Sequence, residues 1–378
     1  MKPNTILIPG IALIYICFIS SAYSVNPTII ALPDTQFYSA NNPAIFTNMT
    51  QWMVNNVATR NITMVIGLGD IVNVWDNTGQ WDNANDSLSL LDGVVPYSLL
   101  CGNHDDNWGG HNYLYYNTYF NYTRYLGIYD WYQGNYPSTG NENSYSYFNI
   151  SGDEWMVISL SFEPPDAVLS WANDTLIANS DKNVIVATHS YRFMNGTKST
   201  EGQPIWYKFA KYHSNIRMIL SGHHSTITDG DIYMVERGIN NNTIHEFVLD
   251  YQQELYSGGG YNALFEFIDN NTVNVTSYSS YFDNYLTTNN VILTFNEDCT
   301  IPTEPATEDW VINTTCYIDT QNINISDYDI NITLYGNLWL YNSNITFGSL
   351  NVYDITGTYV DVLTLDPLTD NYFDMSGL

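Results

Sequence analysis

The sequence predicts a layered α/β fold followed by a smaller all-β module. Between about residues 26 and 220, short apolar strands alternate with helical patterns, which is typical of sheets covered by helices. Several of these strands stop at a side chain that can bind a metal ion. Beyond residue 223 the pattern changes to successive strands, which predicts a second sheet.

The helical segments are predicted from the spacing of apolar residues. Ile45, Met49, Trp52, Met53 and Val57 recur at the intervals of one helical face. Three weaker patterns predict helices over 86–91, over 166–177 and around 205–212.

The strands outside the metal-binding pattern are predicted from β-branched and aromatic runs bounded by turn residues. A Ser-Gly-Asp turn separates two of them, and four more follow residue 223; the predicted strands are 144–150, 155–160, 244–250, 262–268, 273–278 and 291–295. Between 109 and 143 the chain is rich in Tyr, Asn and Gly and has weak periodicity. Its length for a loop predicts a functional insertion beside a site.

Composition divides the chain into four segments. Residues 1–24 are predicted to be a signal peptide, because an apolar core from Ile6 to Ile19 precedes the small residues Ala22 and Ser24. An uncleaved membrane anchor is the alternative, but the apolar run is short for a bilayer. Residues 25–297 are predicted to form the main domain and 298–309 a linker with Pro and Glu. Residues 310–378 form a β-rich module, either β-helical or a small β-sandwich.

Charge and composition limit the partners. The formal net charge is −29, and only 13 % of the residues are charged. Such a surface repels phosphate backbones, so we expect no extended nucleic acid as a partner. Fourteen Asn-x-Ser/Thr sequons fit a secreted glycoprotein, although a chain this rich in Asn and Thr also produces sequons by composition. We therefore expect a secreted or cell-surface location, with no membrane span after cleavage.

Five strands end just before a potential metal ligand. In open α/β sheets, ligands bind beyond the carboxyl ends of the strands, so these side chains should converge on one point. The predicted strands and the residues that follow them are 28–32 before Asp34, 63–68 before Asp70, 96–100 before Asn103 and His104, 184–187 before His189, and 216–220 before His223.

The motifs at these ends resemble those of the calcineurin-like metallophosphoesterases. They occur in the family's order over roughly residues 26–295, as Leu32-Pro-Asp-Thr-Gln36, Gly69-Asp-Ile-Val-Asn73, Gly102-Asn-His-Asp105, Thr188-His-Ser190 and Gly222-His-His224. The Asp-Thr-Gln opening, and Asp250-Tyr-Gln252 further on, are similar to a secreted branch of that superfamily. The resemblance implies a four-layer α/β/β/α sandwich with two central mixed sheets.

The chemistry of such a centre assigns roles to the ligands. Two divalent ions about 3.5–4 Å apart can clamp a phosphoryl group, and one carboxylate must bridge them. Asp70 is the candidate bridge. Asn103, His189 and His223 complete one ion with Asp70, a nitrogen and oxygen set that suits Mn, Zn or Fe rather than Ca.

Two of the family's ligands for the second ion are replaced in this sequence. Asp34 should bind it together with Asp70, but Gln36 replaces the His of the family's Asp-x-His opening. Ser225 stands where the family's closing Gly-His-x-His has its second His, and His224 lies one residue early. Gln36, His224 and Ser225 are therefore candidate ligands of lower rank, and the cofactor is expected to be one or two divalent ions.

His104 and Asp105 are the predicted catalytic residues. His104 matches the family residue that lies beside the metals, where it can stabilise phosphoryl charge and protonate the leaving alkoxide. Asp105 follows it and is predicted to orient its ring.

These observations predict a secreted metallophosphoesterase that hydrolyses a phosphomonoester or phosphodiester by metal-activated hydroxide. The alternative is a surface binding or adhesion protein on the same fold that has lost turnover, for which Gln36, Ser225 and the β-rich module argue. In either case the C-terminal module would be an attachment or spacer segment able to contact a cell surface.

Overall fold

The computed structural model describes residues 25–225, 231–240, 242–286 and 290–295, together with the backbone of seven short strands between 310 and 352. The predicted signal peptide and the linker lie outside these residues. Within the described part of the chain, no helix combines the length and the apolar character needed to cross a membrane.

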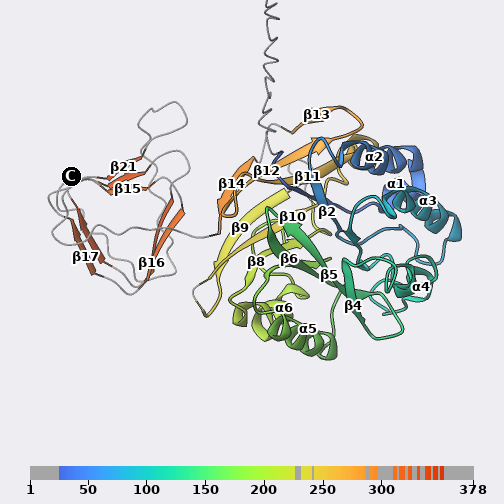
Figure 1. The fold of residues 1–378 in the computed structure, drawn as a ribbon, viewed down its shortest axis with the longest axis horizontal. Coiled ribbons are helices and arrows are strands. Elements are labelled where there is room, and N and C mark those ends of the chain that lie inside the picture. Colours follow the sequence, from blue (N-terminus) through green and yellow to red (C-terminus); the bar gives the residue numbers. More distant parts are fainter. Residues whose placement is uncertain are drawn as a thin grey trace, which may run out of the picture.

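Two mixed seven-stranded sheets form the centre of the molecule (Figure 1). The first has the order β13-β12-β11-β1-β2-β3, with β14 paired to β12, and its strands are β1 (Thr28–Leu32), β2 (Ile62–Gly67), β3 (Tyr97–Ser98), β11 (Tyr261–Phe267), β12 (Thr272–Ser279), β13 (Asn284–Tyr285) and β14 (Val291–Thr294). The second has the order β4-β5-β6-β7-β8-β10-β9, and its strands are β4 (Tyr132–Tyr136), β5 (Asn143–Ile150), β6 (Asp153–Leu160), β7 (Asn183–Thr188), β8 (Ile216–Ser221), β9 (Asp231–Arg237) and β10 (Thr243–Leu249).

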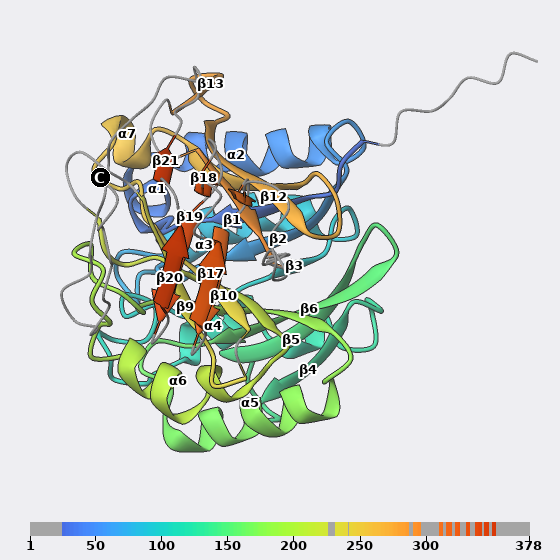
Figure 2. The ribbon, with the colours of Figure 1, turned by 90° about the vertical axis from the view of Figure 1, so that its left-hand side faces the viewer.

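Helices cover the outer face of each sheet. In Figure 2, α2 lies near the top and α5 and α6 lie at the bottom, with the sheets between them. The helices are α1 (Gln36–Asn41), α2 (Pro43–Asn56), α3 (Thr78–Leu88), α4 (Leu114–Tyr119), α5 (Asp166–Ala178), α6 (Gly202–Lys208) and the short α7 (Leu255–Gly258).

Three apolar cores separate four layers. The central core joins the inner faces of both sheets, with Met64 from one and Val157 from the other. A second core packs α2 and α3 on the first sheet, and a third packs α5 and α6 on the second sheet. The predicted four-layer α/β/β/α sandwich is confirmed.

Some predicted elements are placed differently. The helix predicted over 86–91 begins earlier, at Thr78, because the side chain of Asn77 accepts a hydrogen bond from the Gln80 amide and caps its N-terminus; a 3₁₀ turn, Ser89–Leu91, follows it. The strands after residue 223 do not form a sheet of their own. Strand β10 joins β8 in the second sheet, whereas β11, β12 and β14 extend the first.

The aromatic stretch over 109–143 mainly contributes buried side chains to the core. It contains α4 and β4, and the rings of Tyr116, Phe120, Tyr125 and Tyr132 are buried in the core above the first sheet. The predicted functional insertion therefore supplies apolar burial through most of its length.

The seven C-terminal strands pair in parallel, each with a strand about twenty positions along the chain. Strand β18 (Ile330–Ile332) lies between β15 (Trp310–Ile312) and β21 (Leu350–Val352), while β16 (Thr315–Asp319) pairs with β19 (Asn337–Tyr341) and β17 (Asn322–Ile325) with β20 (Asn344–Phe347). Parallel pairing at a regular interval favours the β-helical alternative over the β-sandwich, whose neighbouring strands run antiparallel.

His245, in β10, predicts a pH dependence of stability. Its Nδ1 accepts a hydrogen bond from the Tyr233 hydroxyl, and its Nε2–H donates to the Thr294 carbonyl at 3.0 Å. Burial lowers the pKa of His245 to about 4, whereas the unfolded chain has a histidine pKa of about 6.5. Between these values the unfolded state binds a proton that the folded state does not, so stability falls as the pH falls.

We therefore expect the free energy of unfolding to contain a term from His245 that shrinks by about 2 kcal/mol between pH 7.5 and 5.0. Chemical unfolding of chelator-treated wild type and His245→Gln at both pH values measures it. The variant should lose about 2 kcal/mol less than the wild type over this range. Equal losses in the two proteins would contradict the assignment.

Candidate metal centre

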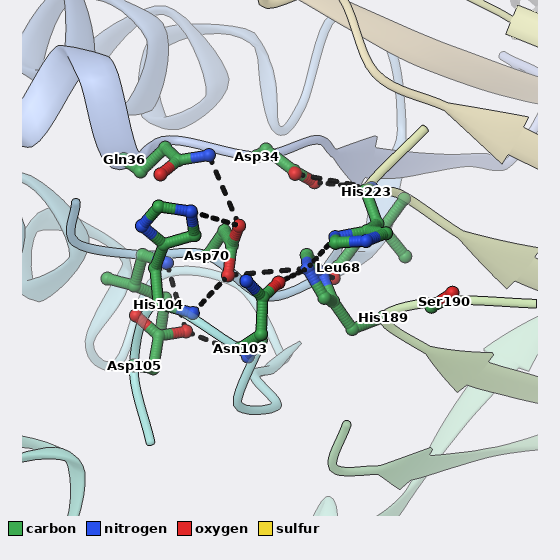
Figure 3. A network of polar contacts seen from close by, with 12 residues as sticks. Asp34, Gln36, Leu68, Asp70, Asn103, His104, Asp105, His189, Ser190 and His223 are labelled. Carbon is green, nitrogen blue, oxygen red and sulfur yellow. Dashed lines mark hydrogen bonds and ion pairs between the residues drawn. The ribbon is translucent and has the colours of Figure 1, made fainter. Parts of the chain in front are cut away.

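The five predicted ligands meet where the two sheets end. The loops after β1, β2 and β3 bring Asp34, Asp70 and Asn103 from the first sheet, and the loops after β7 and β8 bring His189 and His223 from the second (Figure 3). The carboxyl ends of parallel strands thus bring residues up to 189 positions apart into direct contact, as between the His223 amide and the Asp34 carboxylate.

Four of these residues converge on one point. His189 Nε2 lies 3.0 Å from Asn103 Oδ1, 3.0 Å from His223 Nδ1 and 3.3 Å from Asp70 Oδ1. Among the described residues, Asp70, His189 and His223 form a group whose ligand atoms all lie within 4.8 Å of one another. Two imidazole nitrogens, a carboxylate oxygen and an amide oxygen make a donor set that fits Mn, Fe or Zn.

His189 is held in the tautomer that a ligand needs. It is fully buried, and its Nδ1–H donates to the Leu68 carbonyl at 2.8 Å, which leaves Nε2 facing the other donors. Burial alone would lower the pKa of His189, but the carboxylates of Asp70 and Asp34 outweigh it and raise the pKa to about 10. The carboxylates of Asp70 and Asp34 therefore favour a positive charge at this position. A bound metal cation would also supply that charge.

The pKa of His223 shifts in the opposite direction from that of His189. Burial, followed by repulsion from His189 and His224, lowers its pKa to about 3. Its ring is therefore neutral and keeps a free lone pair for a metal. For Asp70, burial raises the pKa, but the attraction of His189 and His104 is stronger and the net shift is downward.

The backbone around the ligands is unusual. Asp70 and His223 have φ angles of +47° and +70°, a left-handed region that non-glycine residues rarely adopt and that is often found at functional sites. Glycines allow the loops to approach closely. A Cβ on Gly102 would lie 2.1 Å from Asp70 Oδ1, and a Cβ on Gly222 would lie 2.1 Å from Asp34 Oδ1.

Asp34 and Gln36 lie on the other side of Asp70. The Asp34 carboxylate accepts hydrogen bonds from the His223 amide at 3.2 Å and from Gln252 Nε2 at 2.9 Å. Gln36 Nε2 donates to Asp70 Oδ2 at 3.2 Å. Both side chains therefore border the position predicted for a second ion.

The two remaining low-rank candidates, His224 and Ser225, lie outside the group of four converging donors. His224 Nε2 lies 3.3 Å from the Ser190 hydroxyl, and its ring packs against Phe193. The side chain of Ser225 forms a hydrogen bond with Asp250. The structure thus places neither side chain among the four converging donors of the first ion, and their role as ligands of the second ion stays a prediction.

Two residues near the centre were not assigned a role from the sequence. Asp250 directly follows β10, and Gln252 Nε2 donates to both Asp34 Oδ2 and Asp250 Oδ2. The sequence pattern predicts Asp250 as the last residue of the strand 244–250. The rule that found the other ligands, a carboxylate just beyond the end of a parallel strand, would have found it as well.

His104 lies beside the donors with its ring oriented toward them. Its Nδ1–H donates to the Asn73 carbonyl at 2.8 Å, and its Nε2 lies 3.9 Å from Asp70 Oδ2. Trp108 is 61 % exposed, and its ring lies 4.0 Å from the imidazole, measured between ring centroids. His104 is therefore placed to contact a group bound at the centre.

The predicted orienting role of Asp105 is wrong. Its carboxylate accepts hydrogen bonds from the backbone amides of Ile71, Val72 and Gly102 at 2.9–3.1 Å, and the Asn73 carbonyl orients the His104 ring instead. Asp105 ties the loop after β2 to the loop after β3. Its role is to hold Asp70 and Asn103 in place.

We expect Asp105→Asn to lower the free energy of unfolding by about 1–3 kcal/mol, because at least one buried amide loses its acceptor. Metal affinity should fall with it, while the pH dependence of turnover should keep its shape. Urea unfolding, metal titration and a pH–rate profile measure the three quantities. A shifted profile with unchanged stability would instead support contact with His104.

Comparisons with known proteins agree with these motifs. The model of the family described as Calcineurin-like phosphoesterase matches residues 27–225. "Uncharacterized protein YvnB" of Bacillus subtilis (strain 168) is 32 % identical over 264 residues, which are 67 % of this chain and 20 % of that protein. The chain thus spans about a fifth of the length of this curated relative.

The solved structures that this chain resembles have little sequence identity to it. Purple acid phosphatase PPD1 from yellow lupin (Lupinus luteus) is 13 % identical with a TM-score of 0.48, over 71 % of this chain and 53 % of that one. GAP50, described as the anchor in the inner membrane complex of Plasmodium, is 14 % identical with a TM-score of 0.45, over 72 % of this chain and 90 % of that one.

Proposed function

The chain belongs to the calcineurin-like phosphoesterase family, and from that premise we propose that it is a metal-dependent hydrolase of a phosphomonoester or phosphodiester. The observation that carries the proposal is the convergence of Asp70, Asn103, His189 and His223 within hydrogen-bond distance of one another. Imidazole nitrogen, carboxylate oxygen and amide oxygen together suit a divalent transition metal.

These residues would hold the first ion, and Asp34 and Asp70 would border a second. When bound, divalent ions at such a centre polarise phosphoryl oxygens and lower the pKa of a water molecule to near neutrality. The chain contributes the fixed geometry. The Leu68 carbonyl orients His189, and Asp105 holds the two loops that carry Asp70 and Asn103.

His104 would act on the leaving group. Because its Nδ1–H is bonded to the Asn73 carbonyl, Nε2 is the nitrogen that faces the centre. Once protonated, it can donate a hydrogen bond to the phosphoryl oxygens and then give its proton to the leaving alkoxide as the P–O bond breaks. Water supplies the oxygen that remains on phosphorus.

Exposed aromatic surface and charge indicate the kind of substrate. Trp108 packs against His104 and is largely exposed, which would suit an apolar or aromatic substituent on the ester. The net charge of −29 disfavours long polyanions. We therefore propose a small phosphoester as the substrate.

Secretion and surface attachment are also part of the proposal. Residues 1–24 have the composition of a signal peptide, and the sequons fit a glycoprotein. The C-terminal strands would form a spacer or attachment module that contacts a cell surface.

A second candidate function is binding at a surface without turnover. Gln36 and Ser225 support it, because each stands where the family pattern has an imidazole. Loss of two imidazoles would weaken the second ion, on which hydrolysis in a two-metal site depends.

One assay separates the candidates. The purified chain is stripped with chelator, Mn²⁺ or Zn²⁺ is added back, and hydrolysis of p-nitrophenyl phosphate and of its bis ester is followed alongside bound metal. Metal-dependent hydrolysis of either ester supports the enzyme. Absence of a rate for both esters, with less than one equivalent of metal bound, would favour the binding protein.

A further inference from the structure

We propose that Asp250 and Gln252 complete a second cation site whose donors are all oxygen atoms, in place of the two imidazoles that the family pattern would supply. The occupant would be a hard divalent cation, Mn²⁺ or Mg²⁺. The inference rests on the proposed function only in taking Asp70 as a ligand shared with the first ion.

Three buried carboxylates surround the proposed position. Asp34, Asp70 and Asp250 are 2 %, 1 % and 1 % exposed. Two amides link them: Gln36 Nε2 donates to Asp70 Oδ2 at 3.2 Å and to Gln252 Oε1 at 2.9 Å, while Gln252 Nε2 donates to Asp34 Oδ2 at 2.9 Å and to Asp250 Oδ2 at 3.2 Å.

The amides do not balance the charge of this group. They donate hydrogen bonds to the carboxylates but carry no positive charge. Buried carboxylates are normally paired with a cation or coordinate a metal, because burial of an uncompensated charge is costly. His189 lies 3.3 Å from Asp70 on the side of the first ion. Asp34 and Asp250 thus favour a further cation on their own side.

A separate observation points to a ligand here. The Gln36 side chain is only 4 % exposed, and its Oε1 is buried without a hydrogen-bond partner among the described residues. Figure 3 shows the Nε2 of this amide turned toward Asp70. A half-turn of the terminal torsion exchanges the two ends and directs Oε1 to the same place, where it can bind a cation.

The sheet topology explains why Asp250 reaches this position. Strand β10 runs parallel to β8, with Val248 opposite Ser221, so the residues that follow each strand emerge at the same edge. Ser225 stands where the family pattern has its second imidazole and hydrogen-bonds Asp250 instead. The smaller Ser leaves room for the carboxylate that replaces the imidazole.

The donor set decides the class of ion. Carboxylate and amide oxygens suit Mg²⁺, Ca²⁺ and Mn²⁺, whereas imidazole suits Zn²⁺. The two neighbouring sites would therefore differ in preference, with the His189 and His223 side accepting Zn²⁺ and the Asp250 side accepting Mn²⁺ or Mg²⁺.

The test is a titration of the chelator-stripped full chain with Mn²⁺ alone, in which the electron paramagnetic resonance signal of free Mn²⁺ gives the number of ions bound. Wild type, Asp250→Asn and Gln252→Leu are compared. Glu201→Gln is the matched control, because Glu201 accepts a hydrogen bond from Ser190 next to His189 and does not belong to the amide-linked group. Circular dichroism checks that each variant is folded. If Asp250→Asn does not fold, Gln252→Leu alone is compared with wild type.

We expect two Mn²⁺ per chain in wild type and Glu201→Gln. In Asp250→Asn and Gln252→Leu the first ion should stay, and the second should bind about 10–100-fold more weakly. A second ion of unchanged affinity in both variants, or a wild type that binds only one Mn²⁺, would overturn the proposal. If two ions bind but no hydrolysis follows, the second cation site is supported and the proposed function is refuted. If hydrolysis occurs with only one ion bound, the proposed function is supported and the second cation site is refuted.

Discussion

Replacement of Asp70 by Asn should remove metal-dependent hydrolysis. The carboxylate is shared: Oδ1 lies 3.3 Å from His189 Nε2, and Oδ2 accepts a hydrogen bond from Gln36. The neutral amide takes away the charge that both proposed ions require. Since metal ions supply several kcal/mol of transition-state stabilisation, turnover should fall by at least about 10³-fold.

Turnover and bound metal should fall together in this variant, and inductively coupled plasma mass spectrometry measures the metal. Asp82→Asn makes the same chemical change at an exposed position, where the carboxylate contacts Tyr119, and should retain both properties. Full metal content with normal turnover in Asp70→Asn would show that Asp70 is not a ligand.

Replacement of His104 by Ala should slow turnover by about 10²–10⁴-fold while the metal remains bound. The ring nitrogen that faces the centre is 3.9 Å from Asp70 Oδ2 and is absent from the four converging donors. Its loss should therefore affect the chemical step. The defect should be larger for an alkyl ester than for a p-nitrophenyl ester, because p-nitrophenolate leaves without protonation.

Steady-state kinetics with both esters, together with metal analysis, tests the role of His104. His111→Ala is the matched control, since His111 is exposed and its ring contacts Tyr113. Parallel loss of metal and activity in His104→Ala, or equal defects with the two esters, would contradict a role in leaving-group protonation.

The ligands of the first ion could be predicted from the sequence because each follows an apolar strand. A parallel strand fixes the edge at which its carboxyl end emerges, so Asp70 and His189 could be brought together without knowledge of the sheet order. The assignment of strands to sheets could not be predicted in the same way. Strands β10 and β11 have similar patterns but join different sheets, because pairing depends on contacts distant in the sequence.

The errors around the centre have a common cause. Asp105 was assigned to the neighbouring His104 from adjacency, but its carboxylate turns to backbone amides in two loops. Asp250 was assigned to a strand, although it lies just beyond β10 and faces the site. Adjacency in the sequence does not show where a loop side chain points, since that depends on the local backbone path.

The same limit applies to the aromatic residues. The rings of Trp81 and Tyr132 are both buried in the outer core. Trp108 instead stays largely exposed beside the catalytic candidate His104. Composition alone does not distinguish a ring that packs from a ring that meets a ligand.

The most direct test of the central claim is an anomalous difference map from a crystal of the chain soaked in Mn²⁺. We predict a peak within bonding distance of Asp70, Asn103 Oδ1, His189 Nε2 and His223 Nδ1. A map in which these four side chains surround no peak, although Mn²⁺ is bound elsewhere on the chain, would contradict the account.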